Sequence, residues 1–204
     1  MTRIANGAGR AYRSELRAQQ AEETRARILD ATVRVMADGL AYVSIPAVAR
    51  EAGASVPTVY RHFATKRDLL AAVYPHVVRS AGLDKLVPPR SMDELRDGVR
   101  TYFDRTDSLD DLARAAMAGP ASDEVRRLNV RDRLAMFRRL ADSVEPKLAR
   151  VDRERIARLL MILTTSSALR MWRDHLRSSV DQAADDVDWM VRAAIEAARR
   201  RNRQ

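Results

Sequence analysis

The residues of this sequence that are best suited to chemistry gather in one short stretch, from Ser44 to Lys66. They are hydroxyls and cations rather than paired carboxylates, thiols or clustered histidines. Such donors bind oxygen-rich, negatively charged surfaces and do not by themselves break bonds. The candidates are Ser44, Ser55, Thr58, Tyr60, Arg61, His62 and Lys66, together with Pro57, which shares the helix expected for most of them.

Two short helices must position these side chains. Ser44 is a good N-cap for the first helix, in which apolar residues recur at positions i, i+3, i+4 and i+7 from Ile45. Gly53 provides a tight turn. Ser55 then caps a second helix, with Pro57 in its first turn, where the missing N–H breaks no intrahelical bond. Two short helices joined by a glycine turn are typical of a helix-turn-helix, whose second helix lies in the major groove of DNA.

The donors on the second helix divide by what they can reach. Ser55, Thr58 and Arg61 lie near its N-terminal half, where base edges come within reach. Tyr60 and His62 are better placed for phosphate oxygens, which position a helix without reading the base sequence. The motif therefore predicts both base contacts and backbone contacts.

The next helix adds a further anion site. Thr65 and Asp68 have the spacing of a capping box, which predicts a helix that begins at Lys66. A helix N-terminus beside a lysine is a natural phosphate site, because free N–H groups and positive charge point the same way. Pro75 lies in the interior of this helix, where it removes a hydrogen bond to the Ala71 carbonyl and predicts a kink.

The stretch "GLAYVSIPAVAREAGASVPTVYRHFATKRDLL" resembles the DNA-binding region of the tetracycline-repressor (TetR) family of bacterial regulators. The family pattern has a Thr-x-x-x-Ile-Ala core, then Ala-Gly-Val-Ser, then Tyr-x-His-Phe, and a Lys that opens the fourth helix. The resemblance covers about residues 22–72, and Pro46 departs from the pattern. The matching residues are Ser44, Val48-Ala49, Ala52-Gly53-Ala54-Ser55, Tyr60-Arg61-His62-Phe63 and Lys66.

This resemblance implies properties that the residue pattern alone does not give. It implies a homodimer, a palindromic double-stranded DNA operator, and a C-terminal helical domain that binds a small molecule and releases DNA. The identity of that small-molecule effector stays open.

The whole chain is basic. Its 204 residues include 37 Lys and Arg against 28 Asp and Glu, a formal net charge of +9. That balance favours polyanionic partners such as nucleic acid. There is no cysteine, which excludes disulfides, thiolate catalysis and cysteine-ligated zinc or iron–sulfur sites.

No segment is expected to cross a membrane or to direct secretion. The N-terminus has basic residues but lacks the apolar core of a signal peptide. The most apolar segment, "LLMILTTSSALRMW", contains a run of hydroxyls and Arg170, and it is too short and too polar to span a bilayer. We therefore expect a cytoplasmic protein.

The chain is expected to be all-α, because no stretch shows sustained strand alternation. We expect a flexible basic N-terminal arm over residues 1–20, a three-helix DNA-binding domain with the helix-turn-helix over 21–66, and a helical effector-binding and dimerisation domain over 67–204. In the last of these, helices are expected at 66–80, 92–105, 109–118, from 122 to before Pro146, from the N-cap Asp152 to 175, and at about 183–200.

Aromatic and thioether side chains in the C-terminal half are candidates for an effector pocket, although plain core packing explains most of them. A run of small hydroxyls from Thr164 to Ser167 either permits close helix contact or orients a ligand. The pocket candidates are Tyr102, Phe103, Met117, Met136, Phe137, Met161, Thr165 and Trp172.

The last two long helices also carry apolar stripes suited to a four-helix dimer interface with two helices from each subunit. The competing interpretation is that these stripes pack inside one chain. The stripe residues are Leu160, Leu163, Ala168, Met171, Val187, Met190, Val191 and Ala194.

Three functions are compatible with these patterns. The first is an effector-responsive transcriptional repressor, and the second is a constitutive helix-turn-helix protein whose C-terminal half only dimerises. The third is a helical enzyme, which is disfavoured because no nucleophile, base or metal set converges. We predict no catalytic residue, cofactor or metal site, since His62, His76 and His175 lie far apart without ligand spacing.

Overall fold

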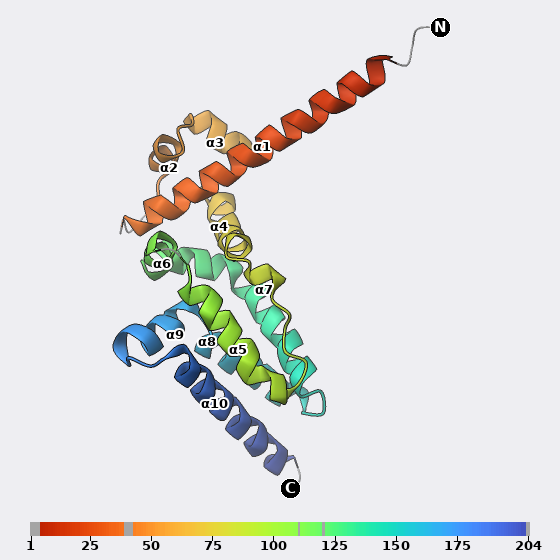
Figure 1. Ribbon diagram of the computed structural model, residues 1–204, viewed down its shortest axis with the longest axis vertical. Helices are drawn as coiled ribbons and strands as arrows, with labels where there is room; N and C mark the ends of the chain where they lie inside the picture. Colours follow the sequence, from red (N-terminus) through yellow and green to blue (C-terminus); the bar gives the residue numbers. More distant parts are fainter. Residues whose placement is uncertain (1–4, 39–42, 110, 120, 203–204) are drawn as a thin grey trace.

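The computed structural model describes residues 5–38, 43–109, 111–119 and 121–202, and every regular element in these ranges is helical. The helices form two groups stacked along the long axis of the molecule, with the chain termini at opposite ends (Figure 1). Helices α1 to α4 build the first group and α5 to α10 the second, with α6 and the start of α7 packed against the first. The predicted all-α class, with an N-terminal helix-turn-helix followed by a helical domain, is confirmed.

The N-terminal group consists of α1 (Ala5–Ala37), α2 (Ile45–Glu51), α3 (Val56–His62) and α4 (Lys66–Ser80). After a 3₁₀ turn, η1 (Leu83–Lys85), the second group contains α5 (Met92–Asp107), α6 (Asp111–Ala118), α7 (Ala121–Val144), α8 (Arg150–Leu163), α9 (Ser166–Arg170), a π-helical turn η2 (Met171–His175) and α10 (Val180–Arg201). Within the described ranges, no helix combines the length and the apolar character needed to cross a bilayer.

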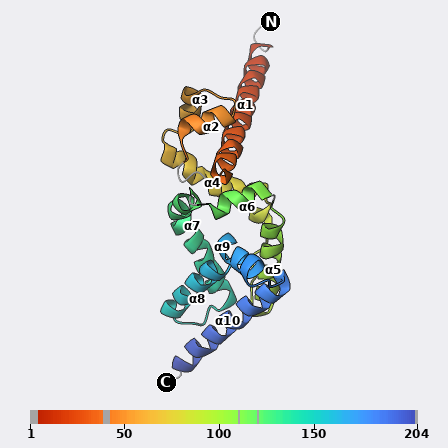
Figure 2. The same cartoon turned by 90° about the vertical axis from the view of Figure 1, so that its left-hand side faces the viewer.

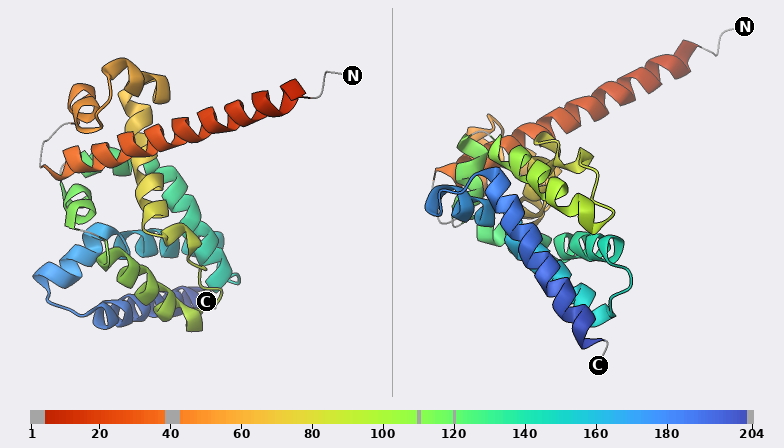
Figure 3. Two further views of the ribbon diagram at one scale, coloured as in Figure 1. Left: turned by 45° about the horizontal axis from the view of Figure 1, so that its top comes forward. Right: turned by 60° about the horizontal axis from the view of Figure 1, so that its bottom comes forward.

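Helix α1 begins much earlier than the sequence led us to expect. The segment 1–20 was expected to be a flexible arm, but residues 5–20 continue the 33-residue helix α1, and residues 1–4 lie outside the described part of the chain. Figure 3 shows this N-terminal half projecting away from the other helices. Ala, Arg, Glu and Gln dominate the segment and are strong helix formers, and extending a helix already nucleated by its packed half costs little.

Two hydrophobic cores hold the molecule together. The first includes Leu69, Leu70, Val73 and Val77 of α4, so α4 packs as part of the N-terminal group along most of its length. It also takes Val125 from α7, beyond the boundary expected after residue 66. The second core is built from α5, the end of α7, α8, α9 and α10. The two groups are therefore joined through packed helices rather than through a linker.

The single helix expected from 152 to 175 is interrupted. Helix α8 ends at Leu163, and the Thr165 hydroxyl accepts a hydrogen bond from the Ala168 N–H at 3.0 Å, which caps a new helix, α9. Asp152, the expected N-cap, lies instead within the first turn of α8, where it is 1% exposed and paired with Arg155 and Arg201. A hydroxyl that can cap a new helix competes with continuation of the preceding one. In this chain α8 ends and the capped helix α9 begins.

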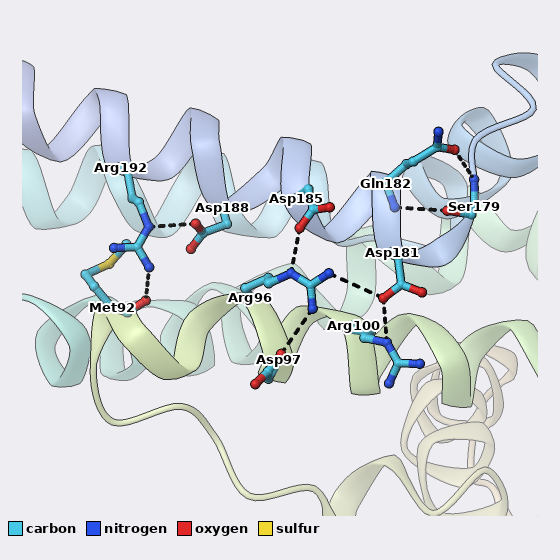
Figure 4. A network of polar contacts seen from close by, with 10 residues as sticks. All are labelled: Met92, Arg96, Asp97, Arg100, Ser179, Asp181, Gln182, Asp185, Asp188 and Arg192. Atoms are coloured by element: carbon cyan, nitrogen blue, oxygen red, sulfur yellow. Dashed lines mark hydrogen bonds and ion pairs between the residues drawn. The ribbon is translucent and has the colours of Figure 1, made fainter.

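A polar network fixes α10 against α5 (Figure 4). Arg96 Nε lies 2.5 Å from Asp185 Oδ1, and Arg100 Nε lies 2.8 Å from Asp181 Oδ1. The hydrogen bond from Arg100 holds the pKa of Asp181 below its usual value. At the other end of the contact, Arg192 donates to the Met92 carbonyl at 2.6 Å. Each exposed pair contributes little alone, but together they set the register of α10 on α5.

We expect Leu69→Ala to lower the free energy of unfolding by about 2–5 kcal/mol, because Leu69 is 0% exposed in the first core and truncation leaves a cavity. Urea denaturation followed by circular dichroism measures this loss. Leu16→Ala is the matched control: Leu16 is 43% exposed, so the change should stay within about 0.5 kcal/mol. Equal losses in the two variants would contradict the assigned core.

Candidate nucleic-acid interface

The local sequence folds α2 and α3 into the predicted helix-turn-helix. The Ser44 hydroxyl accepts from the Ala47 N–H at 3.3 Å, and the Ser55 hydroxyl accepts from the Thr58 N–H at 3.2 Å. Both serines are N-caps as predicted. Between the helices, Gly53 has φ +59, a left-handed conformation that favours glycine. These short-range contacts set the angle at which α3 leaves the turn.

Helix α3 is anchored through one face and one end. Val59 and Phe63 are 0% and 2% exposed in the first core. Arg25 of α1 stacks on the Phe63 ring, with its Cζ 4.3 Å from the ring centroid, and donates to the His62 carbonyl at 3.1 Å. This role of Arg25 has no local signal in the sequence, because the contact spans 37 residues.

The opposite face of α3 presents donors to solvent. Thr58 Oγ1 lies 2.8 Å from Ser55 Oγ and accepts a hydrogen bond from Arg61 Nη2, also at 2.8 Å. Pro57 is exposed beside this chain of contacts, and Tyr60 is 47% exposed. The three predicted base-reading residues are thus brought together on one surface. Because they bond only to one another, they are oriented before any partner arrives.

The remaining predicted residues flank this surface. The His62 side chain is half-buried at the C-terminal end of α3, and Ser44 is exposed at the start of α2. Thr65 and Asp68 form the predicted capping box, with the Asp68 N–H donating to Thr65 Oγ1 at 3.1 Å and the Thr65 N–H donating to Asp68 Oδ2 at 3.0 Å. Lys66 is therefore held at the ordered N-terminus of α4.

Lys66 has a neighbour that sequence reasoning did not foresee. Its Nζ lies 3.8 Å from Glu124 Oε2 on α7, in the second group of helices. The two side chains are 36% and 43% exposed, so the pair is screened by water and is weak. A phosphate oxygen can replace the carboxylate at small cost.

Taken together, α3 and the start of α4 can bind a polyanion. Helix α3 contains no acidic residue. Its buried side is fixed to the core, while its free side carries hydroxyls, a guanidinium and a phenol that suit base edges and phosphates. A helix fixed in this way and exposed along one face matches the geometry of a recognition helix in the major groove.

A cavity of about 500 Å³ lies in the second group, between α4, α5, α7 and α8 and the segment from Leu83 to Arg90. Of the eight pocket candidates, Tyr102, Met136 and Phe137 line it. Thr164, from the run of hydroxyls noted in the sequence, also lines it. The remaining lining residues, none of which was a pocket candidate, are Tyr74, Val78, Leu83, Leu86, Val87, Pro88, Pro89, Arg90, Leu95, Gly98, Val99, Arg139, Leu140, Ser143 and Leu160.

The other five candidates lie elsewhere. Phe103 is 0% exposed in the second core, and Thr165 caps α9. Met161 and Trp172 pack against the second core, and Met117 is buried in α6. Aromatic and methionine side chains are common both in cores and in ligand pockets, so residue type alone could not distinguish core residues from pocket residues.

Comparisons with known proteins agree with this geometry. Residues 28–73 match the model of the bacterial regulatory proteins of the tetR family. No curated protein matches the chain. A transcriptional regulator from Rhodococcus sp. Rha1 is similar in structure, with a TM-score of 0.60, 20% sequence identity, and coverage of 85% of this chain and 97% of that one. A tetR-family transcriptional regulator from Streptomyces coelicolor has a TM-score of 0.51 at 22% identity, over 87% of this chain and 82% of its own.

At these identities the two solved structures establish the fold, and they share it over most of the chain. The family match covers all of α2 and α3, the last ten residues of α1 and the first eight of α4. The donor surface lies within this region. Residues 28–73 are similar to the DNA-binding region of the TetR family of bacterial regulatory proteins, and the helix-turn-helix of α2 and α3 lies within them.

Proposed function

We propose that the protein binds a palindromic operator as a cytoplasmic homodimer, represses transcription there, and releases DNA when a small molecule occupies the cavity. One observation carries this proposal. Helix α4 begins at Lys66, beside the donor surface of α3, and lines the cavity with Tyr74 and Val78. A single helix thus belongs to both sites.

The length of α4 suits it to transmit a displacement. Lys66 and Tyr74 are eight residues apart, which is about 12 Å along a helix. Pro75 lies beside Tyr74 inside the helix and leaves the Ala71 carbonyl without its usual donor. A dimeric helix-turn-helix protein needs its two recognition helices about 34 Å apart, one turn of DNA. A shift of α4 by a few ångströms therefore disturbs that spacing.

The surface proposed for dimerisation differs in part from the predicted stripes. Leu160, Val187 and Val191 are each 0% exposed and belong to the second core, so they pack inside the chain. The helices that carry them, α8 and α10, pack against each other (Figure 2). On their outer sides, Ile162 is 66% exposed and Trp189 is 71% exposed. We assign the interface to these outer faces, since exposed large apolar side chains mark association surfaces.

We expect Lys66→Ala and Tyr60→Phe to weaken binding to all DNA sequences, because we assign these residues to phosphate contacts. Thr58→Ala or Arg61→Ala should instead change base preference by about 1–3 kcal/mol per contact. Gel-shift titrations on randomised sites measure both effects. Arg79→Ala, at the far end of α4 and exposed, is the control and should leave affinity unchanged. Full affinity in a Tyr60, Lys66 double variant would contradict the interface.

We expect Ile162→Asp to shift the protein toward monomer at micromolar concentration, because a carboxylate buried between subunits has no counter-charge. Light scattering measures the mass. Val130→Asp serves as the control, since Val130 on α7 is also partly exposed, at 41%, but lies outside α8 and α10. A strictly monomeric wild-type protein that still binds a palindrome would rule out the proposed dimer.

We expect Leu140→Trp, which fills the cavity, to mimic an effector and to lower operator affinity roughly 5- to 150-fold. Leu140 lines the cavity on α7. Because the chain has no cysteine, Arg61→Cys gives one labelling site per subunit for pulsed electron spin distances. The distance between labels should change with Leu140→Trp. If Leu140→Trp leaves operator affinity unaffected, the protein is a constitutive DNA-binding protein. If affinity is lost while the distance between the labels is unchanged, the coupling does not depend on the spacing of the recognition helices.

A further inference from the structure

An arginine is buried beside the cavity without a counter-ion among the described residues. Arg133 on α7 is 7% exposed, and its Nε is enclosed without a hydrogen-bond partner. Its described contact is with Tyr74 of α4, whose ring centroid lies 5.1 Å from the Arg133 Cζ. A cation–π contact offsets only part of the cost of removing a guanidinium from water. The site therefore favours an incoming negative charge.

Two phenols stand between this charge and the cavity. Tyr74 and Tyr102 both line the cavity. Burial raises the pKa of Tyr102 to about 12, with the neighbouring Tyr74 acting in the same direction and Arg133 opposing it. The Tyr102 hydroxyl thus stays protonated at neutral pH and can donate a hydrogen bond to an anionic oxygen.

The rest of the wall is mostly apolar, with Ser143, Thr164 and two arginines as its polar residues. Val78, Val99, Phe137 and Leu140 represent its apolar part. Among the lining residues, the only charged ones are Arg90 and Arg139, both exposed on the chain surface. Since no carboxylate is among the described residues that line the cavity, its field favours anions.

We propose that the effector is an organic acid, an apolar molecule with one carboxylate that binds Arg133 at the wall formed by Tyr74 and Tyr102. The proposal rests on the effector-responsive function proposed above. A volume of about 500 Å³ is typical for ligands of drug size. A carboxylate matches the single buried cation, whereas a phosphate monoester carries about −1.5 to −2 charges and would leave an unpaired charge in the interior.

This chemistry also supplies a route to α4. Arg133 stacks on Tyr74, and Tyr74 is part of α4. A carboxylate offers the guanidinium a stronger, charge-assisted partner than the tyrosine ring does. Occupancy therefore weakens one of the contacts that hold α4 against α7, and the released helix can shift at its DNA-facing end.

Matched probes test the charge requirement. Calorimetry with the full-length protein would compare decanoate with decanol, decylamine and decyl phosphate, and 4-phenylbutyrate with 4-phenylbutanol. We expect the carboxylates to bind about 10- to 100-fold more tightly than their neutral or cationic counterparts, as for a charge-assisted hydrogen bond. Binding of the carboxylate should also release operator DNA in a gel shift. Preferential binding of the alcohols, the amine or the phosphate would overturn the proposal, as would the absence of binding by every probe.

Substitutions locate the charge. Arg133→Met should lower carboxylate affinity about 10- to 100-fold and leave alcohol affinity unchanged. Arg139→Met removes an exposed arginine that itself lines the cavity, whereas Arg133 reaches it only through Tyr74, and should change affinity less than about threefold. Thermal unfolding checks that each variant folds. Arg133→Lys keeps the charge but loses the two parallel N–H donors of the guanidinium, so its carboxylate affinity should be intermediate. Unchanged carboxylate binding in Arg133→Met overturns the assignment.

The outcome separates this inference from the proposed function. If Leu140→Trp releases operator DNA while no carboxylate binds, effector control stands and the organic-acid class falls. If neither releases DNA, although Lys66→Ala weakens DNA binding, effector control itself fails.

Discussion

The arrangement depends on one constraint: α4 is packed in the N-terminal core and also forms a wall of the cavity. Leu69, Leu70 and Val73 tie it to α1 and the helix-turn-helix, whereas Tyr74 faces the cavity from the same helix. Because protein interiors are close-packed, a packed helix moves as a unit rather than deforming gradually. Under the proposed function, α4 is therefore the element through which a change at Tyr74 would reach Lys66 and α3.

The contacts that join the two groups differ in strength from those within each group. Inside the first group, apolar residues with no exposure fix α3 and α4. Between the groups, the ion pair of Lys66 with Glu124 at 3.8 Å is exposed, whereas Val125 of α7 is fully buried in the first core. Exposed pairs exchange readily with water. The joint between the groups therefore combines a weak polar contact with apolar packing, and only the polar contact is easily exchanged.

The parts of this structure that the sequence predicted are those determined over short chain distances. Ser44, Ser55 and Thr65 each cap through a residue three positions later, so their spacing alone is informative. The Thr165 cap has the same spacing, but it lies in an apolar run, where continuation of the helix looked equally favourable. Local propensity also underestimated α1, since its residues 14–21 are exposed and therefore need no apolar period.

Long-range placement could not be predicted in the same way. Tyr102 and Phe103 are adjacent in sequence, yet one lines the cavity and the other is fully buried in the second core. Which side of α5 meets a cavity depends on α4, α7 and the segment after η1, and those contacts leave no pattern in α5 itself. Arg133 is a similar case, because an arginine on an amphipathic helix normally lies in solvent. Its burial becomes evident only when α4 is placed against α7.

Helix α5 explains why a ligand in the cavity should act mainly on α4. Helix α5 forms another wall of the cavity. It carries Tyr102 on the side that faces the cavity and Arg96 and Arg100 on its other side. Those arginines hold α10 through Asp181 and Asp185, and α10 is further fixed by the fully buried Val187. Moving α5 would require breaking several ion pairs at once. Moving α4 relative to α7 would require exchange of the Arg133–Tyr74 contact and of the exposed Lys66–Glu124 pair, and a shift of the apolar packing around Val125. Under the proposed function, a bound molecule acts on the α4 wall when it favours the shifted arrangement, because α4 is the wall that begins at Lys66.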